Sequence, residues 1–542
     1  MKKYTFKDAL KTHEVRKSSR KNWDSTNDEI AYYVLPSQTG FITEFVPGER
    51  QRWSYRYDTT AGYANKKLAN TLHMSMVSPS QPWFDVRLKD VELGKQDIVK
   101  EWLEDTTKKM YLAFAESNFN AQINTLFQCF CAFGTASIET NFEVKPNNPF
   151  TLLFKNIDLS LSTFDYNASY QIDTKVEEFK FTQRQANEKF DKDFGEGTAD
   201  NATGERLIKI LKVTRPNPDY VPDSLIPKER AYLVEWCYDK QLFDTETSYE
   251  QPFQVVRYSQ IKQDSIYGEG PALLALSDIR SVNELKRLEL RAAAKAVDKP
   301  LIGSPNAVMS DLHTEPGGYT IVRNVREIGE LPGGMDIQTV MYKSEDLRNS
   351  ILTAYSITDI DIPDRKGQNP LTATEVQLRQ EQAQMMLGAA VGRIKDELLT
   401  PMLERVFGLM LRNGRFVEMP DELSGANIEI SFIGPLAKAQ NMQVGMAITR
   451  AMEFSMSVSQ LTGQPSKVID FDKAEREAYD IFGTPASVIR SEEEVAQIEA
   501  AQQKAQQQQA EQENAMANAK VEQEQVAANS AQVELAQNVR GI

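Results

Sequence analysis

The chain has 542 residues, of which 41% are hydrophobic and 26% are charged, so it can hold several compact domains and is neither fibrous nor wholly disordered. Its formal net charge of −15 argues against broad wrapping of nucleic acid, which needs many Lys and Arg contacts to phosphate. A mostly acidic wall would suit a conduit through which DNA slides, although acidity that only keeps the protein soluble explains the charge equally well.

From the sequence we expect neither a membrane span nor a secretory signal. No apolar run approaches the roughly 18 residues that a membrane span needs, and the charged first ten residues are not followed by the apolar stretch of a secretory signal. The three cysteines, Cys129, Cys131 and Cys237, have no disulfide-framework spacing. We therefore expect the protein to be made and assembled in a reducing cytoplasm.

The first half of the chain divides into a helical part and a strand-rich part. Residues 61–77 have apolar positions three or four apart and predict a helix, and residues 95–133 predict a second helical region. From Thr135 to about Tyr258, short β-branched and aromatic runs are separated by Asn, Pro and Gly. They predict antiparallel strands, with one short helix at 182–194.

A helix, a turn-rich insert and a second helix follow. Pro271 stands at a first helical position, and the helical pattern continues to Val297. The apolar residues of this helix recur at every third position, at Leu273, Leu276, Ile279, Val282, Leu285 and Leu288. Such a stripe turns around the helix, so neighbours must contact several of its faces. Residues 299–336 are rich in Gly and Pro, with a strand expected at 319–322, and 338–357 again has helical spacing.

The polar side of the first helix is mostly basic, with Arg280, Glu284, Arg287, Arg291 and Lys295. Glu284 is placed to pair with Arg280, four residues before it, or with Arg287, three residues after it. A solvated charged face is a simpler explanation of this ridge than a contact with nucleic acid.

The chain then enters a long breaker loop and a long helix. Residues 358–370 interrupt the helical pattern, and Thr372 with Glu375 forms the capping box of a helix that runs to Asn413-Gly414. Pro401 is expected to kink or divide this helix.

The last part of the chain changes from structured to low-complexity sequence. Residues 427–433 alternate like a strand, and 438–482 is helical with a break near Gly463. The tail, 491–542, is rich in Gln, Ala and Glu and has no aromatic residue. It cannot build a core alone, so we expect a solvated helix, a helix that assembles with copies of itself, or disorder.

The spacing of Gly, His, Cys and acidic residues in the sequence does not match the enzyme and metal-site motifs that we compared. The chain has neither a Gly-x-x-x-x-Gly-Lys-Ser/Thr phosphate loop nor a His-Glu-x-x-His zinc helix, and its three histidines lie in different segments. Cys129 and Cys131 lack a second ligand pair, so we expect core packing there. The carboxylates between Asp359 and Asp364 do not fit a calcium loop, because Pro370 stands where a Glu is needed. We predict no catalytic residue, no metal and no cofactor.

The sequence resembles the portal, or head-to-tail connecting, proteins of short-tailed phages. Three stretches carry the resemblance: Tyr33-Val-Leu-Pro-Ser37, residues 61–88 ending in Pro82-Trp-Phe-Asp-Val-Arg-Leu88, and Tyr267-Gly-Glu-Gly-Pro-Ala-Leu273 running into Asp278-Ile-Arg-Ser-Val-Asn-Glu-Leu285. The order helix, Gly/Pro-rich β insert, helix, breaker loop and capped helix is also similar to the portal plan. The likeness covers about residues 20–480.

The resemblance implies a predominantly helical α+β fold that assembles into a ring, with wing, stem, clip and crown. In this sequence the parts would be the wing (1–266), a first stem helix (267–298), the clip (299–337), a second stem helix (338–357), the tunnel loop (358–371), a wing helix and strand (372–435), the crown (436–490) and the tail (491–542).

The resemblance also implies where DNA passes. The tunnel loop would place Arg365, Lys366, Gln368 and Asn369 nearest the duplex. Arg280, Arg287, Arg291 and Lys295 would line the channel or the stem surface. Contacts with phosphate should be weak and without base readout, because sliding forbids deep energy wells.

As a portal, the protein would be a non-enzymatic virion component at one capsid vertex. Its partners would be further copies in a ring that is commonly dodecameric in this family, double-stranded DNA, the terminase large subunit, tail adaptor or nozzle proteins, and the major capsid and scaffold proteins, with no membrane. Two alternatives remain: a metal-dependent hydrolase or nuclease that uses the carboxylates at 359–364, and another virion component such as a scaffold or adaptor.

Overall fold

The computed structural model describes residues 5–36, 41–42, 55–79, 81–89, 96–145, 148–194, 199–200, 206–297, 301–303, 328–330, 337–357, 388–423, 428–432, 435–462 and 468–482, except 223, 225, 261 and 263, and isolated positions elsewhere. The chain forms two compact units. The first comprises Met1–Arg87, Thr106–Val417 and Glu429–Pro435, and the second comprises Leu88–Asp105, Glu418–Ile428 and Leu436–Ile542. The mixture of helices and strands confirms the predicted α+β class.

Helices α2 and α3 pack around α5 in the first unit. The bounds are Lys21–Tyr33 for α2, Thr60–Met76 for α3 and Phe119–Phe133 for α5. The helix predicted at 61–77 is therefore confirmed. The region predicted as helical over 95–133 is two helices, α4 (Asp97–Glu116) and α5. They are separate because the hydroxyl of Ser117 accepts a hydrogen bond from the backbone N–H of Phe119 at the start of α5.

Two antiparallel sheets follow, as the strand-like texture predicted. The three-stranded sheet has the order β10-β2-β3, with β2 at Thr135–Lys145, β3 at Asn148–Asn156 and β10 at Phe253–Arg257. The larger sheet has the order β4-β5-β7-β8-β9, and its strands are Ser162–Tyr166, Ile172–Thr182, Arg206–Pro216, Tyr232–Tyr238 and Gln241–Ser248. The two-residue β6 (Ala199–Asp200) pairs with β7, and β1 (Phe84–Leu88) pairs with β13 (Ile428–Phe432).

Two helices cover opposite faces of the larger sheet. Helix α1 (Phe6–Ser19) begins at a capping box formed by Thr5 and Asp8 and packs on the face that carries Val176 and Val213. Helix α6 (Gln183–Phe190) lies on the other face, against Ile208, Ile210 and Trp236. Successive strand residues point to opposite faces of a sheet, so on β7 Ile208 and Ile210 pack against α6 and Val213 packs against α1. Helix α6 confirms the short helix expected at 182–194.

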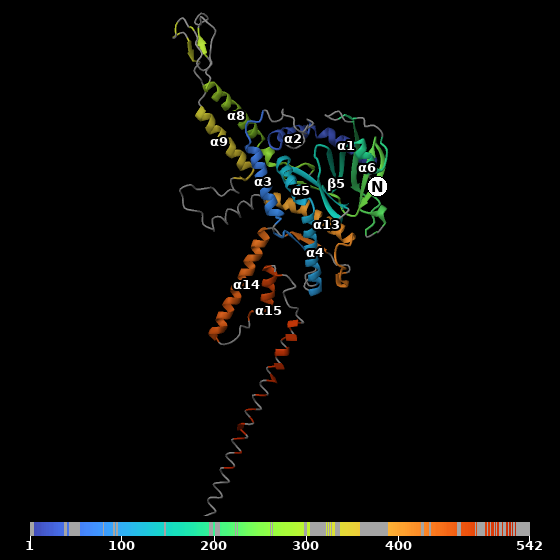
Figure 1. Ribbon diagram of the computed structural model, residues 1–542, viewed down its shortest axis with the longest axis vertical. Coiled ribbons are helices and arrows are strands. Elements are labelled where there is room, and N and C mark those ends of the chain that lie inside the picture. The colour runs from blue at the N-terminus through green and yellow to red at the C-terminus, as the bar shows by residue number, and fades with distance from the viewer. Residues whose placement is uncertain are drawn as a thin grey trace, which may run out of the picture. The chain divides into compact units, whose positions relative to one another are not determined.

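The helix, insert and helix predicted in the middle of the chain are present. Helix α7 (Pro271–Leu274) leads into α8 (Leu276–Val297), and α9 (Ile337–Ala354) returns along it. Helices α8 and α9 pack together, and Figure 1 shows them side by side with short strands at one end. These strands, β11 (Leu301–Gly303) and β12 (Ile328–Glu330), pair antiparallel. The strand expected at 319–322 is not seen at Ile321, and its other residues lie outside the described part.

The long helix after the breaker loop is described from residue 388 onward. It comprises α12 (Gly388–Arg393), a π-helical turn η4 (Ile394–Leu399) and α13 (Thr400–Arg412). The π-helical turn ends two residues before Pro401, because Pro lacks the N–H that a regular helix would use there. The predicted division at Pro401 is confirmed. The helix ends at Gly414, whose φ is +63°, as predicted. The expected capping box at Thr372 and Glu375 lies outside the described residues.

Two helices dominate the described part of the second unit. Helix α14 (Pro435–Thr462) and helix α15 (Phe471–Phe482) stand on either side of the predicted break near Gly463. Helix α14 exposes several large apolar side chains, including Phe454 at 71% and Leu461 at 87%. None of the described helices is both long enough and apolar enough to cross a bilayer.

Candidate functional site

The base of the α8–α9 pair is built on a close meeting of backbones. Gly134 has a φ of +68°, which favours Gly, and a Cβ on it would lie 2.3 Å from the backbone N of Gly270. A Cβ on Gly268 would lie 2.4 Å from the carbonyl oxygen of Gly134. Because side chains do not fit, the end of α5 and the segment that starts α7 approach each other directly. Pro271 at the first helical position then sets the direction of the helix.

Polar contacts fasten both helices to the segment directly before α3. Asn283 of α8 accepts a hydrogen bond from the backbone N–H of Tyr57 at 2.7 Å. Arg348 of α9 forms an ion pair with Asp58 at 2.9 Å, and Asp58 also accepts from the N–H of Thr60 at the start of α3. Burial opposes ionisation of Asp58, but hydrogen bonds from Thr60 and the charge of Arg348 outweigh it, so the pKa of Asp58 is lowered.

A further hydrogen bond joins the two helices to each other. The hydroxyl of Ser350 on α9 donates to the carboxylate of Asp278 on α8 at 2.8 Å. Buried apolar residues lie on the other faces of the pair, namely Ile279 and Val282 on α8, Ile351 on α9 and Tyr355 directly after α9. The pair is thus a fixed element of the first unit, held by packing and by specific polar contacts.

The basic ridge predicted on α8 lies on the surface. Arg280 is about half exposed and pairs with Glu29 of α2, while Glu284 pairs with Arg287. Of the two pairings open to Glu284, the structure therefore has the one with Arg287. Arg291 is exposed and forms no ion pair among the described residues. The side chain of Lys295 lies outside the described part of the structure.

The predicted tunnel-loop residues lie outside the described residues. This holds for Arg365, Lys366, Gln368 and Asn369, and for the carboxylates of the alternative hydrolase site at 359–364. Their assignments remain predictions.

A buried charge network, which the sequence analysis did not predict, joins the two sheets. Lys175 of β5 is fully buried and pairs with Glu139 of β2 at 2.7 Å and with Glu177 at 2.9 Å. Lys212 of β7 also pairs with Glu139, and Lys155 of β3 reaches Glu177 at 2.8 Å. Burial disfavours the charged form of Glu139, yet the two ammonium groups hold its pKa well below the ordinary value.

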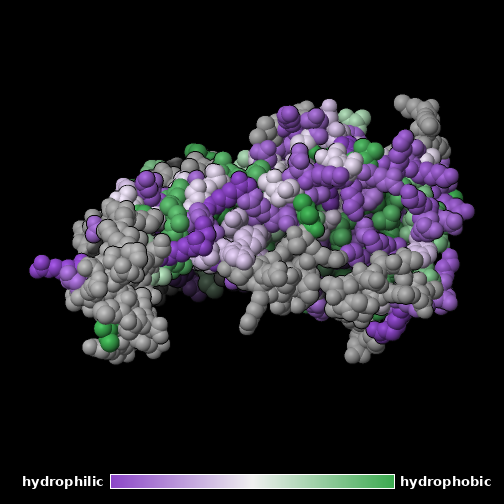
Figure 2. Space-filling view, turned by 90° about the horizontal axis from the view of Figure 1, so that it is seen from above, coloured by the Kyte–Doolittle hydropathy of each residue, from purple (hydrophilic) through white to green (hydrophobic). Residues whose placement is uncertain are grey.

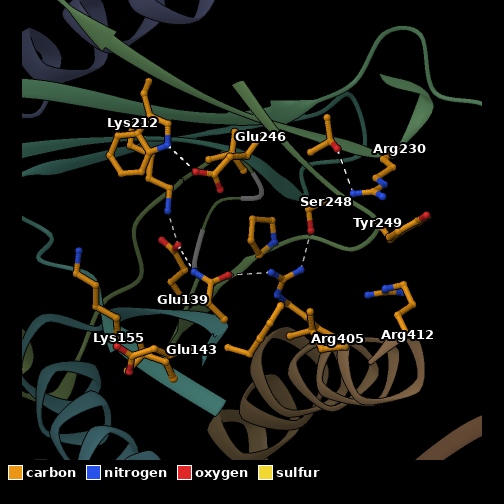
Figure 3. Close-up of a pocket in the computed structure, with 18 of the residues that line it drawn as sticks. Glu139, Glu143, Lys155, Lys212, Arg230, Glu246, Ser248, Tyr249, Arg405 and Arg412 are labelled. Atoms are coloured by element: carbon orange, nitrogen blue, oxygen red, sulfur yellow. Dashed lines mark hydrogen bonds and ion pairs between the residues drawn. The ribbon is translucent and has the colours of Figure 1, made fainter. Parts of the chain in front are cut away.

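A cavity of about 640 Å³ adjoins this network. Figure 3 shows Arg405 of α13 and Ser248 pointing toward one another, and Arg230 and Arg412 on either side of Tyr249. Arg405 is buried and donates to Ser248 at 2.7 Å and to the carbonyl oxygen of Thr140. Burial lowers the pKa of Arg405 to about 10. The charged side chains around the cavity therefore hold the sheets and α13 together.

No group of three or more His, Cys, Asp or Glu side chains in the described ranges is arranged to hold a metal ion. Cys129 and Cys131 are buried, as core packing predicts, and burial raises the pKa of Cys129 to about 12. His13 is buried against the hydroxyl of Thr163 at 2.6 Å, and burial, together with Lys17, lowers its pKa to about 4.

Comparisons with known proteins identify the family. The family described as "Bacteriophage head to tail connecting protein" matches residues 7–489. The "Probable portal protein" of Bordetella phage BPP-1 is 27% identical over 501 residues, which cover 89% of this chain and 88% of that protein. The "Portal protein" of Salmonella phage epsilon15 is 23% identical over 504 residues, which cover 90% of this chain and 89% of that protein. As the resemblance predicted, the chain belongs to the bacteriophage head to tail connecting proteins, a family of structural connectors and not of enzymes.

Proposed function

We propose that this chain is the subunit of a phage portal, a closed ring at one capsid vertex through which double-stranded DNA is packaged and later ejected. The family match across residues 7–489 carries the proposal, and both relatives are named as portal proteins. One heterologous interface, repeated until the rotation closes, makes such a ring. A dodecamer is the expected number of copies.

The parts of the proposed portal follow the order of the chain. Helices α8 and α9 form the stem around the pore, and the insert at 299–337, with β11 and β12, forms the clip. The two sheets and α13 form the wing, and α14 and α15 form the crown. The packed, fastened α8–α9 pair supports this assignment, because a stem must keep its shape while DNA moves past it.

The partners follow from the same assignment. The clip faces the terminase large subunit during packaging and the tail adaptor or nozzle proteins afterwards. The wing contacts the major capsid and scaffold proteins, and the ring assembles in the host cytoplasm before it becomes part of the virion.

The channel would act as a passive conduit. The acidic net charge of −15 keeps phosphate from binding tightly, and charges more than a Debye length of about 8–10 Å apart are largely screened. A few basic side chains in the tunnel loop, Arg365 and Lys366, would then guide the duplex without holding it. Replacing both with Ala should leave rings intact and change packaging or DNA retention. Normal packaging and retention of DNA in the double variant would show that Arg365 and Lys366 do not contact DNA in the channel.

The assembly itself is tested on the purified full chain. Negative-stain images and native mass measurement should show closed rings with a central hole roughly 20 Å or wider, enough for a duplex. A protein that stays monomeric at high concentration contradicts the proposal.

A further inference from the structure

The cavity between the two sheets and α13 carries an excess of positive charge. Its volume of about 640 Å³ lies in the range of pockets that hold ligands. Six basic side chains line it against three Glu side chains, although the chain as a whole has a net charge of −15. The basic residues are Lys155, Lys189, Lys212, Arg230, Arg405 and Arg412. The cavity therefore favours an anion.

Three Lys side chains gather at one end of the cavity. The ammonium groups of Lys189 and Lys212 lie 4.3 and 5.2 Å from the ring centre of Trp236. Those of Lys155 and Lys189 lie 4.0 and 5.6 Å from the ring centre of Phe179. Burial of its ammonium group and the charges of Lys212 and Lys155 lower the pKa of Lys189. An anion at this end would relieve the repulsion between these groups.

Two Arg side chains stand at the other end, beside Tyr249 (Figure 3). The guanidinium groups of Arg230 and Arg412 lie 4.4 and 4.5 Å from the ring centre of Tyr249. Arg412 is already paired with Glu250 at 2.6 Å. Arg230 donates to the hydroxyl of Thr247 at 3.4 Å, and its buried Nε–H has no hydrogen-bond partner within the described ranges. Arg230 therefore keeps a donor that its own chain does not use.

Lys189 and Arg230 leave one uncompensated charge at each end. Neither forms an ion pair with a carboxylate in the part of the chain that the structure describes. Of the lining carboxylates, Glu139 already pairs with two Lys side chains, and Glu246 accepts a hydrogen bond from the indole of Trp236 at 3.2 Å. A ligand must therefore supply the missing negative charge at both ends.

The two ends are too far apart for one small ion. Tyr249 directly follows Ser248, which lies opposite Tyr232, and Trp236 is four residues further along β8. With a rise of about 3.3 Å per residue, the two ends are about 13 Å apart. Two side chains four residues apart in an extended peptide span about the same distance. An elongated molecule with several carboxylates therefore fits the cavity better than a single phosphate.

Recognition by charge does not need a broad apolar surface. On the face shown in Figure 2, most described residues are hydrophilic and apolar residues show in small separate patches. Within the cavity, the apolar side chains of Leu153, Val234 and Leu409 stand among the basic ones. They can contact the carbon atoms of a peptide whose carboxylates pair with the cations.

We propose that this cavity binds an extended acidic segment of a protein partner, with one carboxylate at Lys189 and another at Arg230. The inference goes beyond the portal function, because it assigns a binding site that neither the ring nor the pore requires. Lys212 and Arg405, which are 7% and 4% exposed, give the cavity fixed walls, so the site exists before the ligand arrives.

Fluorescence anisotropy with labelled hexaglutamate on the full chain tests the site. Hexaglutamate should bind at least about tenfold more tightly than hexaglutamine, and also than diglutamate, which cannot reach both ends. Arg230→Gln should weaken binding of hexaglutamate about tenfold, because charge-assisted hydrogen bonds of Arg are strong. Lys189→Gln should weaken it about threefold, because Lys189 is exposed. The double variant should lose about thirtyfold, since distant sites act independently.

Controls separate the loss of charge from damage to the fold. Lys228 is exposed and lies two residues before Arg230, but it does not line the cavity, so Lys228→Gln should leave the affinity unchanged. Arg230→Lys keeps the charge and loses the planar fork, and should weaken binding less than Arg230→Gln does. The urea midpoint of each variant shows whether it folds as the unmodified chain does.

The outcomes decide between ligand classes. Equal affinity for hexaglutamate and hexaglutamine, or unchanged affinity in the double variant, would overturn the proposal. Inorganic phosphate or a short DNA duplex that binds more tightly than hexaglutamate and displaces it would also overturn the proposal, because the cavity would then be a phosphate site. Peptide binding does not depend on the ring, so a chain that binds hexaglutamate and forms no ring contradicts only the proposed function.

Discussion

Removal of one cation from the buried charge network should destabilise the two sheets more than removal of a cation from an exposed ion pair does. In Lys175→Met, Glu139 keeps Lys212 and a hydrogen bond from Asn141 at 2.7 Å, and Glu177 keeps Lys155. Breaking a buried pair usually costs about 3–5 kcal/mol. Because both carboxylates keep a partner, we expect the lower end of that range, about 3 kcal/mol.

Urea unfolding followed by tryptophan fluorescence measures this loss. With a slope near 3 kcal/mol per M, the midpoint should fall by about 1 M. Lys240→Met provides the control, because the Lys240–Glu14 pair has a similar distance, 2.9 Å, but is exposed, and its midpoint should not move. Equal midpoints for the two variants would refute the reasoning that burial makes the Lys175 contacts strong.

Three further substitutions test other parts of the structure. Asp58→Asn should lower the free energy of unfolding by about 1–2 kcal/mol and speed hydrogen exchange in α9, since it removes the ion pair with Arg348. Because folding lowers the pKa of Asp58, the stability that this carboxylate contributes should be lost as the pH falls through its pKa in the folded protein. Folding lowers the pKa of His13 from 6.5 to about 4. Its contribution to the free energy of unfolding should therefore be fully present above about pH 6.5 and decline toward pH 4, because the unfolded chain takes up the proton first. A His13→Gln variant should lose this pH dependence of the urea midpoint. Gly268→Ala should cost about 2 kcal/mol or more through a contact 2.4 Å from backbone, while Gly388→Ala, which meets nothing within 4 Å, should not destabilise.

Much of the secondary structure follows from local patterns in the sequence. The Pro271 start, the stop at Gly414 and the division at Pro401 depend on residues whose backbone preferences act locally, and all three are present. The alternation in 427–433 correctly predicted β13. The break at Ser117 was missed, because a single hydroxyl that accepts from the first N–H of α5 leaves the apolar periodicity on both sides intact.

The charged contacts were harder to predict, because they join residues far apart in the chain. Lys175 and Glu139 are 36 positions apart, and Arg348 and Asp58 are 290 apart. The available signal was charged residues inside strands that otherwise look buried, such as Lys212 and Glu139. Such residues indicate that a partner must exist, but they do not identify it. The pairing of Arg280 with Glu29 was missed for the same reason.

A cryo-electron microscopy reconstruction of the purified full-length protein tests the central claim most directly. We predict a closed ring in which α8 and α9 of every copy surround a pore wide enough for duplex DNA, with β11 and β12 at one end of the helix pair. A reconstruction in which these helices lie away from the pore, or particles without a central hole, would contradict it.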